Sequence, residues 1–215
     1  EILHRDSLGS LQSIRTGDIN LMVAGRGIVH SERERPECTA VDHALNGLQL
    51  WLALPDEQEE TMPSFHHYPG EAVPALTVDG VPVRVMIGSA WGVTSPVRQF
   101  SKTLYVEARL RRGQALVLPP AEERALYVVS GALDAHGAAL AEHSMAVFAN
   151  QPGIEVRATE DARVALIGGA PVGERFIEWN FVSSREERIE QAKLEWQAGR
   201  FPKVPGDEKE FIPLP

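Results

Sequence analysis

Short apolar runs separated by turn-forming residues constrain the fold of this chain more than any other feature of its sequence. Gly, Pro, Asp or Asn bounds each run, and this rhythm is typical of the strands of antiparallel sheets. The predicted strands span residues 19–24, 48–54, 81–87, 104–110, 115–118, 125–129, 144–148 and 164–167. The sequence therefore predicts an all-β protein built as a barrel or a sandwich.

Two local patterns refine this prediction. Residues 48–54 alternate, so that four leucines fall on one face of the strand and Trp51 on the other, and we expect the leucine face to be core. Gly-containing turn signals at 16–18, 79–80 and 130–131 indicate hairpin connections, because Gly permits a positive φ without steric cost.

Breaks in these patterns suggest the domain organisation. Residues 55–60 are acidic and are followed by prolines, which predicts a long surface connection. A second break at residues 91–101 is the candidate domain boundary. We therefore predict the remainder of a first barrel at 1–95, a second barrel at 96–175, and a C-terminal α-helix with a Pro-rich tail at 176–215.

The tail carries the clearest helical signal. Ser183 and Glu186 fit a capping box, and Ile189 and Trp196 belong to a set of residues spaced three and four apart. Gly199 then predicts the end of the helix. We expect this helix to pack on a barrel, with partner binding as the alternative, and the tail beyond it to wrap the surface or to be mobile.

Charge and cysteine content exclude several classes of function. With 21 basic and 30 acidic residues, the net charge of -9 argues against direct binding to nucleic acid. No apolar run approaches the roughly 20 residues that cross a bilayer, so we expect no membrane association. The single cysteine, Cys38, cannot form an internal disulfide, and we expect a cytoplasmic protein.

The densest chemical signal is the segment Gly-Arg-Gly-Ile-Val-His-Ser-Glu at residues 25–32. If the part from Ile28 onward is extended, His30 and Glu32 project to the same face, because strand side chains repeat every two residues. Such a pair suits a divalent ion such as iron, which accepts nitrogen and oxygen ligands together. The alternative is a histidine at a strand end that is hydrogen-bonded to a neighbour.

Several segments, in their order and spacing, resemble the pirin family of the cupin superfamily. They are His-Arg-Asp-Ser-Leu-Gly at 4–9, Ile-Arg-Thr-Gly-Asp at 14–18, the segment at 25–32, Gly-Leu-Gln-Leu-Trp-Leu-Ala-Leu-Pro at 47–55, and two later segments at 127–131 and 181–184. The resemblance covers nearly the whole chain. It implies a bicupin of two antiparallel β-barrels, with metal in the N-terminal barrel only.

In that family the metal is typically iron, held by three histidines and one glutamate, and the last two ligands match His30 and Glu32. The other two form an H-x-H pair on an earlier strand, and this chain contains no H-x-H. Because His66 and His67 are adjacent, they would point to opposite faces of a strand, and we expect them to be loop residues instead. We expect the first barrel to be incomplete here and its metal binding to be weak or absent.

The remaining candidates have simpler interpretations. We expect His4 to be a strand-end residue without a metal role, and His43 and Cys38 to be ordinary loop residues, with titration and redox reactivity as the respective alternatives. His136 and His143 lack a partner motif, so the second barrel shows no metal site. The sequence also lacks the motifs of serine hydrolases, P-loop proteins and zinc fingers.

The resemblance implies two classes of function. The first is an iron-dependent quercetin (flavonol) 2,3-dioxygenase, an oxidoreductase in which Glu32 accepts the substrate's hydroxyl proton as the catalytic residue and Arg26 either steers the anion or forms a structural ion pair. The second is a non-enzymatic, metal-dependent regulator that binds protein partners. A third possibility is a cupin that has lost its metal site and retains only its fold.

Overall fold

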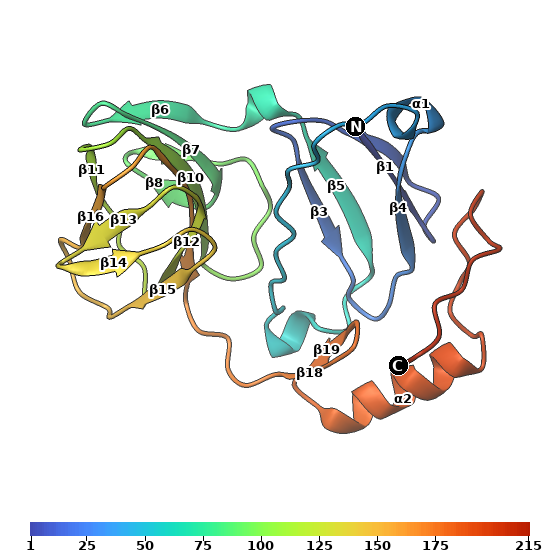
Figure 1. The fold of residues 1–215 in the computed structure, drawn as a ribbon. Helices are drawn as coiled ribbons and strands as arrows, with labels where there is room; N and C mark the ends of the chain where they lie inside the picture. Colours follow the sequence, from blue (N-terminus) through green and yellow to red (C-terminus); the bar gives the residue numbers. More distant parts are fainter. The chain divides into compact units, whose positions relative to one another are not determined.

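The computed structural model describes residues 1–215, and its regular structure is almost entirely β. The chain divides into a first unit, Glu1–Gly70 with Val172–Pro215, and a second unit, Glu71–Pro171. Both chain ends therefore lie in the first unit (Figure 1). No helix of the structure combines the length and the apolar character that a membrane span requires.

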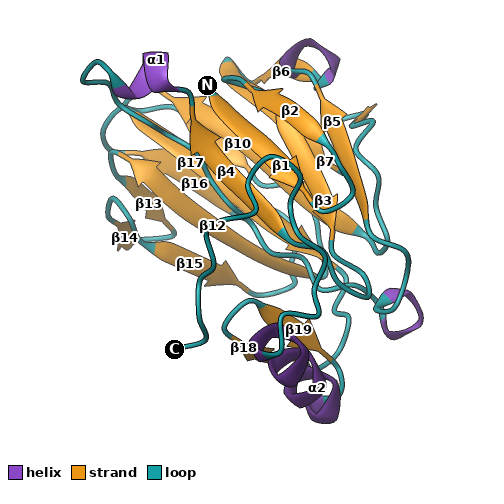
Figure 2. Cartoon of the chain, turned by 90° about the vertical axis from the view of Figure 1, so that its right-hand side faces the viewer, coloured by secondary structure: helices purple, strands orange, loops and turns teal.

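The first unit consists of three small antiparallel sheets, β2-β1-β4, β3-β5 and β18-β19. Its elements in chain order are β1 (Ile2–Asp6), β2 (Leu11–Ile14), β3 (Ile19–Val23), β4 (His30–Glu34), α1 (Pro36–Thr39), the 3₁₀ helix Asp56–Gln58, β5 (Ser64–Tyr68), β18 (Phe176–Glu178), β19 (Phe181–Ser183) and α2 (Glu186–Gln197). Helix α2 packs against the β18-β19 hairpin, as Figure 2 shows.

The second unit consists chiefly of a six-stranded sheet, β15-β12-β17-β10-β7-β6, and a four-stranded sheet, β11-β16-β13-β14. After a 3₁₀ helix at Gly70–Ala72, its strands are β6 (Ala75–Val78), β7 (Val81–Ile87), β8 (Ser89–Ala90), β9 (Val93–Thr94), β10 (Thr103–Leu110), β11 (Ala115–Val117), β12 (Glu123–Ser130), β13 (Leu133–Ala135), β14 (Ala138–Leu140), β15 (Met145–Phe148), β16 (Glu155–Ala158) and β17 (Ala162–Gly169).

The main hydrophobic core lies within the second unit. Alternate residues of the strands turn inward, as in β12, where Leu126 and Val128 are fully buried between half-buried neighbours. Buried residues of both sheets, such as Val106 and Val156, belong to the same cluster. The two sheets thus share one core, and the prediction of an all-β fold is confirmed.

The predicted boundary between residues 95 and 96 falls inside the second unit. Strand β7 pairs with β10 and β6 pairs with β7, so residues 71–95 share a sheet with the strands that follow them. Residues 176–215 join the first unit, where Ser184 and Arg185 hydrogen-bond with Glu59 and Glu60 before β5. Hydrogen-bonding partners of strands are not encoded in local breaks of the sequence pattern.

The predicted strand at 48–54 does not form. No strand occurs between β4 and β5, and Leu48, Trp51 and Leu52 are exposed at 42%, 53% and 50%. Since a strand is stabilised by the neighbour with which it pairs, an alternating pattern without a paired neighbour leaves the segment irregular. The expected leucine core face is therefore wrong for this structure.

Only one of the three predicted hairpins is found. Asp79 and Gly80, both with positive φ, join the paired strands β6 and β7. The turns at 16–18 and 130–131 instead link strands of different sheets, because β2 does not pair with β3 and β12 does not pair with β13. The turn residues indicate a change of direction but not the partner of the next strand.

The C-terminal helix forms without the predicted capping box. Helix α2 begins at Glu186 with no side-chain cap, because the Ser183 hydroxyl accepts the N–H of Arg185 at 3.1 Å and donates to Glu59. Ile189 is buried, and Trp196 stacks on Phe211 of the tail at 5.0 Å. The Pro-rich tail thus packs on the first unit. Of the two expectations for it, a surface wrap or a mobile tail, the first is confirmed.

The second-unit core gives a stability prediction. Leu126→Ala should lower the free energy of unfolding by about 2–5 kcal/mol, because it leaves a cavity in a fully buried position. Val147→Ala, at a side chain that is 81% exposed in the same unit, should change it by less than about 0.5 kcal/mol. Urea unfolding followed by circular dichroism measures both, and equal effects would contradict this placement of the core.

Candidate metal centre

The antiparallel pairing of β1 with β4 places two short motifs opposite each other. His4 and Asp6 on β1 are two residues apart, as are His30 and Glu32 on β4. In the register of this pair, His4 lies directly across from Glu32, and Asp6 directly across from His30. Because strand side chains alternate between faces, all four side chains share one face of the sheet.

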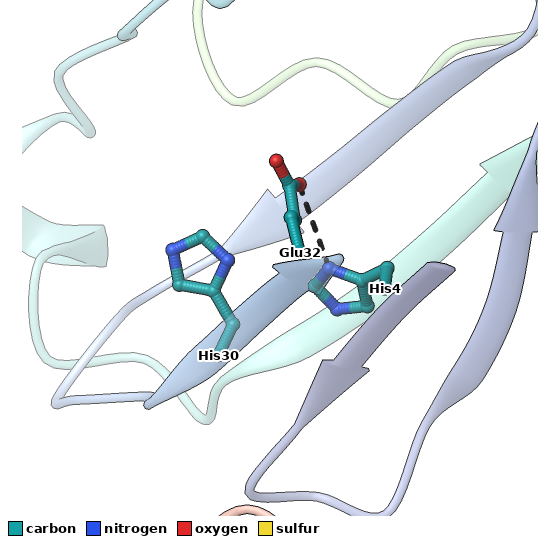
Figure 3. A group of neighbouring side chains, drawn as sticks. All are labelled: His4, His30 and Glu32. Atoms are coloured by element: carbon teal, nitrogen blue, oxygen red, sulfur yellow. Dashed lines mark ion pairs between the residues drawn. The ribbon is translucent and has the colours of Figure 1, made fainter. Parts of the chain in front are cut away.

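Three of these side chains converge (Figure 3). His4, His30 and Glu32 each offer one ligand atom, and these atoms all lie within 4.8 Å of one another. The Nδ1 atom of His4 is 3.7 Å from Oε1 of Glu32, and the rings of His4 and His30 are 5.7 Å apart between centroids. The structure thus brings together both residues of the predicted pair and adds a second imidazole.

His4 forms the buried floor of the cluster. Its side chain is 1% exposed, whereas that of Glu32 is 38% exposed. The ring stacks on Phe65 of β5, with centroids 4.1 Å apart and planes tilted by 11°. Its Nε2 atom lies 3.2 Å from Oδ2 of the buried Asp6, while its Nδ1 atom is buried without a hydrogen-bond partner. A buried nitrogen without a partner is a vacant donor position for a cation or a proton.

The protonation equilibria of the cluster are coupled through His4. Burial of the His4 ring lowers its pKa, but its contacts with Glu32 and Asp6 raise it more, so the net pKa lies above the ordinary value. The contact with His4 lowers the pKa of Glu32, against the effect of burial. Loss of surrounding water lowers the pKa of His30, and Glu32 only partly opposes this. Glu32 is therefore an ionised carboxylate beside two imidazoles of different basicity.

The turn before β4 explains the Gly-Arg-Gly segment of the motif. Gly25 has a φ of +51°, and a Cβ there would lie 2.1 Å from the carbonyl oxygen of Thr61. That same oxygen accepts the N–H of Arg26 at 3.0 Å, and the N–H of Gly27 closes the turn onto Ala24 at 2.9 Å. Only glycine fits this close approach, so the segment fixes the point from which β4 starts.

The histidines at positions 43, 66 and 67, which were predicted to lie outside the metal site, lie outside the cluster of His4, His30 and Glu32. His66 and His67 lie on strand β5, so their assignment to a loop is wrong, but they make separate contacts: His66 with Ser64 at 3.0 Å and His67 with Asn20 at 2.8 Å. His43 is exposed and lies 2.6 Å from Glu34. Neither group reaches the cluster.

His4 lies inside β1 and is buried beside Glu32, so its expected place at a strand end is corrected. A signal for it was present in the sequence: His4 and Asp6 repeat the same-face spacing of His30 and Glu32. The sequence does not specify that β1 pairs with β4, because β2 and β3 lie between these two strands along the chain. That register alone brings the two motifs together.

The donor set fits a divalent transition metal. Two imidazole nitrogens and one carboxylate oxygen are ligands that iron, zinc and nickel accept, and Nδ1 of the buried His4 makes no hydrogen bond. The partial exposure of Glu32 leaves an open side through which further ligands or a substrate can approach.

Comparisons with known proteins agree with this geometry. The family model described as "Pirin" matches residues 1–52, and that described as "Pirin C-terminal cupin domain" matches residues 105–202. A pirin-like protein of Caulobacter vibrioides is 46% identical over 219 residues, covering 100% of this chain and 75% of that protein. A Pseudomonas aeruginosa protein, whose name gives quercetin 2,3-dioxygenase as its provisional activity, is 36% identical and covers 93% of this chain.

This chain spans 62% of the length of the Pseudomonas protein. Among solved structures, a quercetin 2,3-dioxygenase from Acinetobacter baumannii superposes with a TM-score of 0.85 at 29% identity, covering 100% of this chain and 72% of that one. The sequence matches span the segment that carries both motifs of the cluster, and the fold match spans both units. This chain therefore belongs to the pirin family of cupin proteins.

Proposed function

We propose that His30 and Glu32, together with His4, hold a divalent transition metal, iron in the first instance, and that the site oxidises a flavonol-like substrate with O₂. The observation that carries the proposal is the convergence of two imidazoles and one carboxylate from paired strands. The relatives named for quercetin 2,3-dioxygenase support the substrate class.

The chemistry of the site follows from its residues. A bound metal would supply Lewis acidity toward a substrate hydroxyl. Glu32 is ionised because His4 lowers its pKa, and its oxygen Oε1 faces His4, which leaves Oε2 to accept the proton of that hydroxyl. The buried side of the cluster, formed by His4 and Phe65, keeps water from that side of the site.

The assignment of Glu32 as the catalytic residue rests on this geometry. Glu34 is the next carboxylate on the same face of β4, and it pairs with His43 instead. The two residues have the same chemistry and the same strand but different surroundings, so they form a matched pair for testing. We also propose a cytoplasmic location, because the free thiol of Cys38 needs no oxidising compartment.

Metal binding is the first prediction. His30→Ala and Glu32→Gln should each weaken binding of Fe²⁺ to the chain, measured anaerobically by titration calorimetry, by more than the roughly 10–100-fold that loss of an outer-shell partner costs. Glu34→Gln and His43→Ala should leave the affinity unchanged. If the two sets of variants bind Fe²⁺ equally, the ion is held elsewhere and the assignment fails.

Turnover is the second prediction. With Fe²⁺ and quercetin, the protein should consume O₂, and Glu32→Gln should reduce kcat by roughly 10²–10⁴-fold, the usual contribution of a positioned general base. An oxygen electrode measures the rate, with Glu34→Gln as the control. Turnover that survives Glu32→Gln would reject the role of Glu32. Tight metal binding with no turnover of any flavonol would instead favour a metal-dependent regulator that binds protein partners.

A further inference from the structure

A cavity of about 550 Å³ opens at one end of the second unit. Strand β10 begins there at Thr103, β12 begins at Glu123 and β17 ends at Gly169, and in the strand register Gly169 lies across from both Thr103 and Glu123. Segments that enter or leave these strands, around Lys102 and Ala121, line the cavity. Its volume lies within the roughly 300–1,000 Å³ that is usual for sites that bind small molecules.

The bottom of this cavity is apolar and its opening is polar. Leu104, which is buried in the core shared by the two sheets, lines the cavity, and so does Ala121, which packs against the same core. The lining side chains of Lys102, Glu122 and Asn150 are exposed to solvent. A site of this kind suits a small molecule that has an apolar body and a polar group at one end.

Arg124 is a buried cation close to this cavity that no carboxylate neutralises. It is 2% exposed and faces the core, because Leu126 and Val128 on the same face of β12 are fully buried. Its side chain forms hydrogen bonds with backbone carbonyl oxygens only, and its Nε atom is buried without a partner. Since a guanidinium stays protonated in proteins, Arg124 carries a full positive charge inside the second unit.

The hydrogen bonds of Arg124 place its charge behind the cavity walls. It donates to the carbonyl oxygens of Ala149 at 3.3 Å and Gln151 at 2.5 Å, and Asn150 between them lines the cavity. It also donates to the carbonyl oxygen of Pro119 at 3.0 Å, and the next residue along the chain lines the cavity as well. The guanidinium thus holds two of the segments that shape the cavity.

The charges around the cavity do not balance. Nζ of Lys102 lies 3.9 Å from Oε1 of Glu122, and these side chains are 85% and 55% exposed, so one exposed cation faces one exposed anion. Arg124 remains in excess, and water and salt screen a buried charge less than an exposed one. The cavity therefore favours an anion, although the net charge of the chain is -9.

We propose that this cavity binds a small organic carboxylate. The apolar part of the ligand packs on Leu104 and Ala121, and its carboxylate lies at the opening, where Lys102 and Asn150 offer N–H donors. Arg124 attracts the carboxylate through its charge and without contact. The site goes beyond the proposed metal chemistry, because every residue of it belongs to the second unit.

The experiment uses the full chain with benzoate as the probe and benzamide as an uncharged molecule of the same shape. In ¹⁵N-labelled protein at constant ionic strength, benzoate should shift the backbone amide signals of residues 102–104, 121–122 and 169–170. The expected Kd is roughly 1–10 mM, the range that ligand efficiency allows for a molecule of this size. Benzamide should bind more weakly than benzoate.

Charge variants then test which groups attract the anion. Lys102→Gln should weaken benzoate binding by roughly 3–10-fold, the size expected of one charge at the edge of a solvated site, and Glu122→Gln should strengthen it by a similar factor. Arg124→Met should reduce the preference for benzoate over benzamide, and Arg124→Lys should retain it. The matched control is Arg109→Gln, which removes a positive charge from an exposed position of β10 outside the cavity and should change nothing.

Three results would overturn the proposal. They are equal binding of benzoate and benzamide, no shifts around the cavity with either probe, and a loss of affinity in Arg109→Gln as large as that in Lys102→Gln, which would reflect the net charge of the chain alone. If Arg124→Met does not fold, Lys102→Gln and Glu122→Gln still decide, because both change exposed side chains. His30→Ala should leave benzoate binding unchanged, so failure of the metal site and failure of this site are separate results.

Discussion

The register of one antiparallel strand pair determines which side chains meet in the candidate metal centre. Because side chains alternate along a strand, pairing His4 with Glu32 also pairs Asp6 with His30 and sets all four on one face. A slip of one residue in the register of β4 would move the side chains of His30 and Glu32 to the opposite face of the sheet from His4, and the cluster would not form. The tight turn at Gly25, into which no larger residue fits, precedes β4 and therefore helps to set where this strand begins.

The electrostatic balance of the cluster suits a divalent cation. Hydrogen bonds from Ser10 and His4 lower the pKa of Asp6 against the effect of burial, and His4 lowers that of Glu32. Two ionised carboxylates thus flank a buried imidazole, and together they match the charge of one divalent ion. Without such an ion, a proton on His4 provides part of that compensation, which is consistent with its raised pKa.

Part of this picture was predictable from the sequence. The same-face pairing of His30 and Glu32 follows from the two-residue period, and the strands of the second unit follow from apolar runs, because their alternation reflects a core that they bury themselves. Residues 48–54 behave differently: their alternation is equally regular, yet no strand pairs with them and they remain irregular. His4 was missed for a related reason, since its role depends on which strand lies beside β1, and local patterns do not specify partners.

The discontinuity of the first unit has a consequence for how the chain is made. Residues 71–171 form one continuous stretch and leave the ribosome as a complete set of strands, so this unit can fold during synthesis. The first unit must wait for α2 and for Asp207, which pairs with Arg33 on the outer side of β4. The strand that carries His30 and Glu32 is thus stabilised through Arg33 by a residue that is translated after the whole second unit, so this contact forms only once that unit has been synthesised.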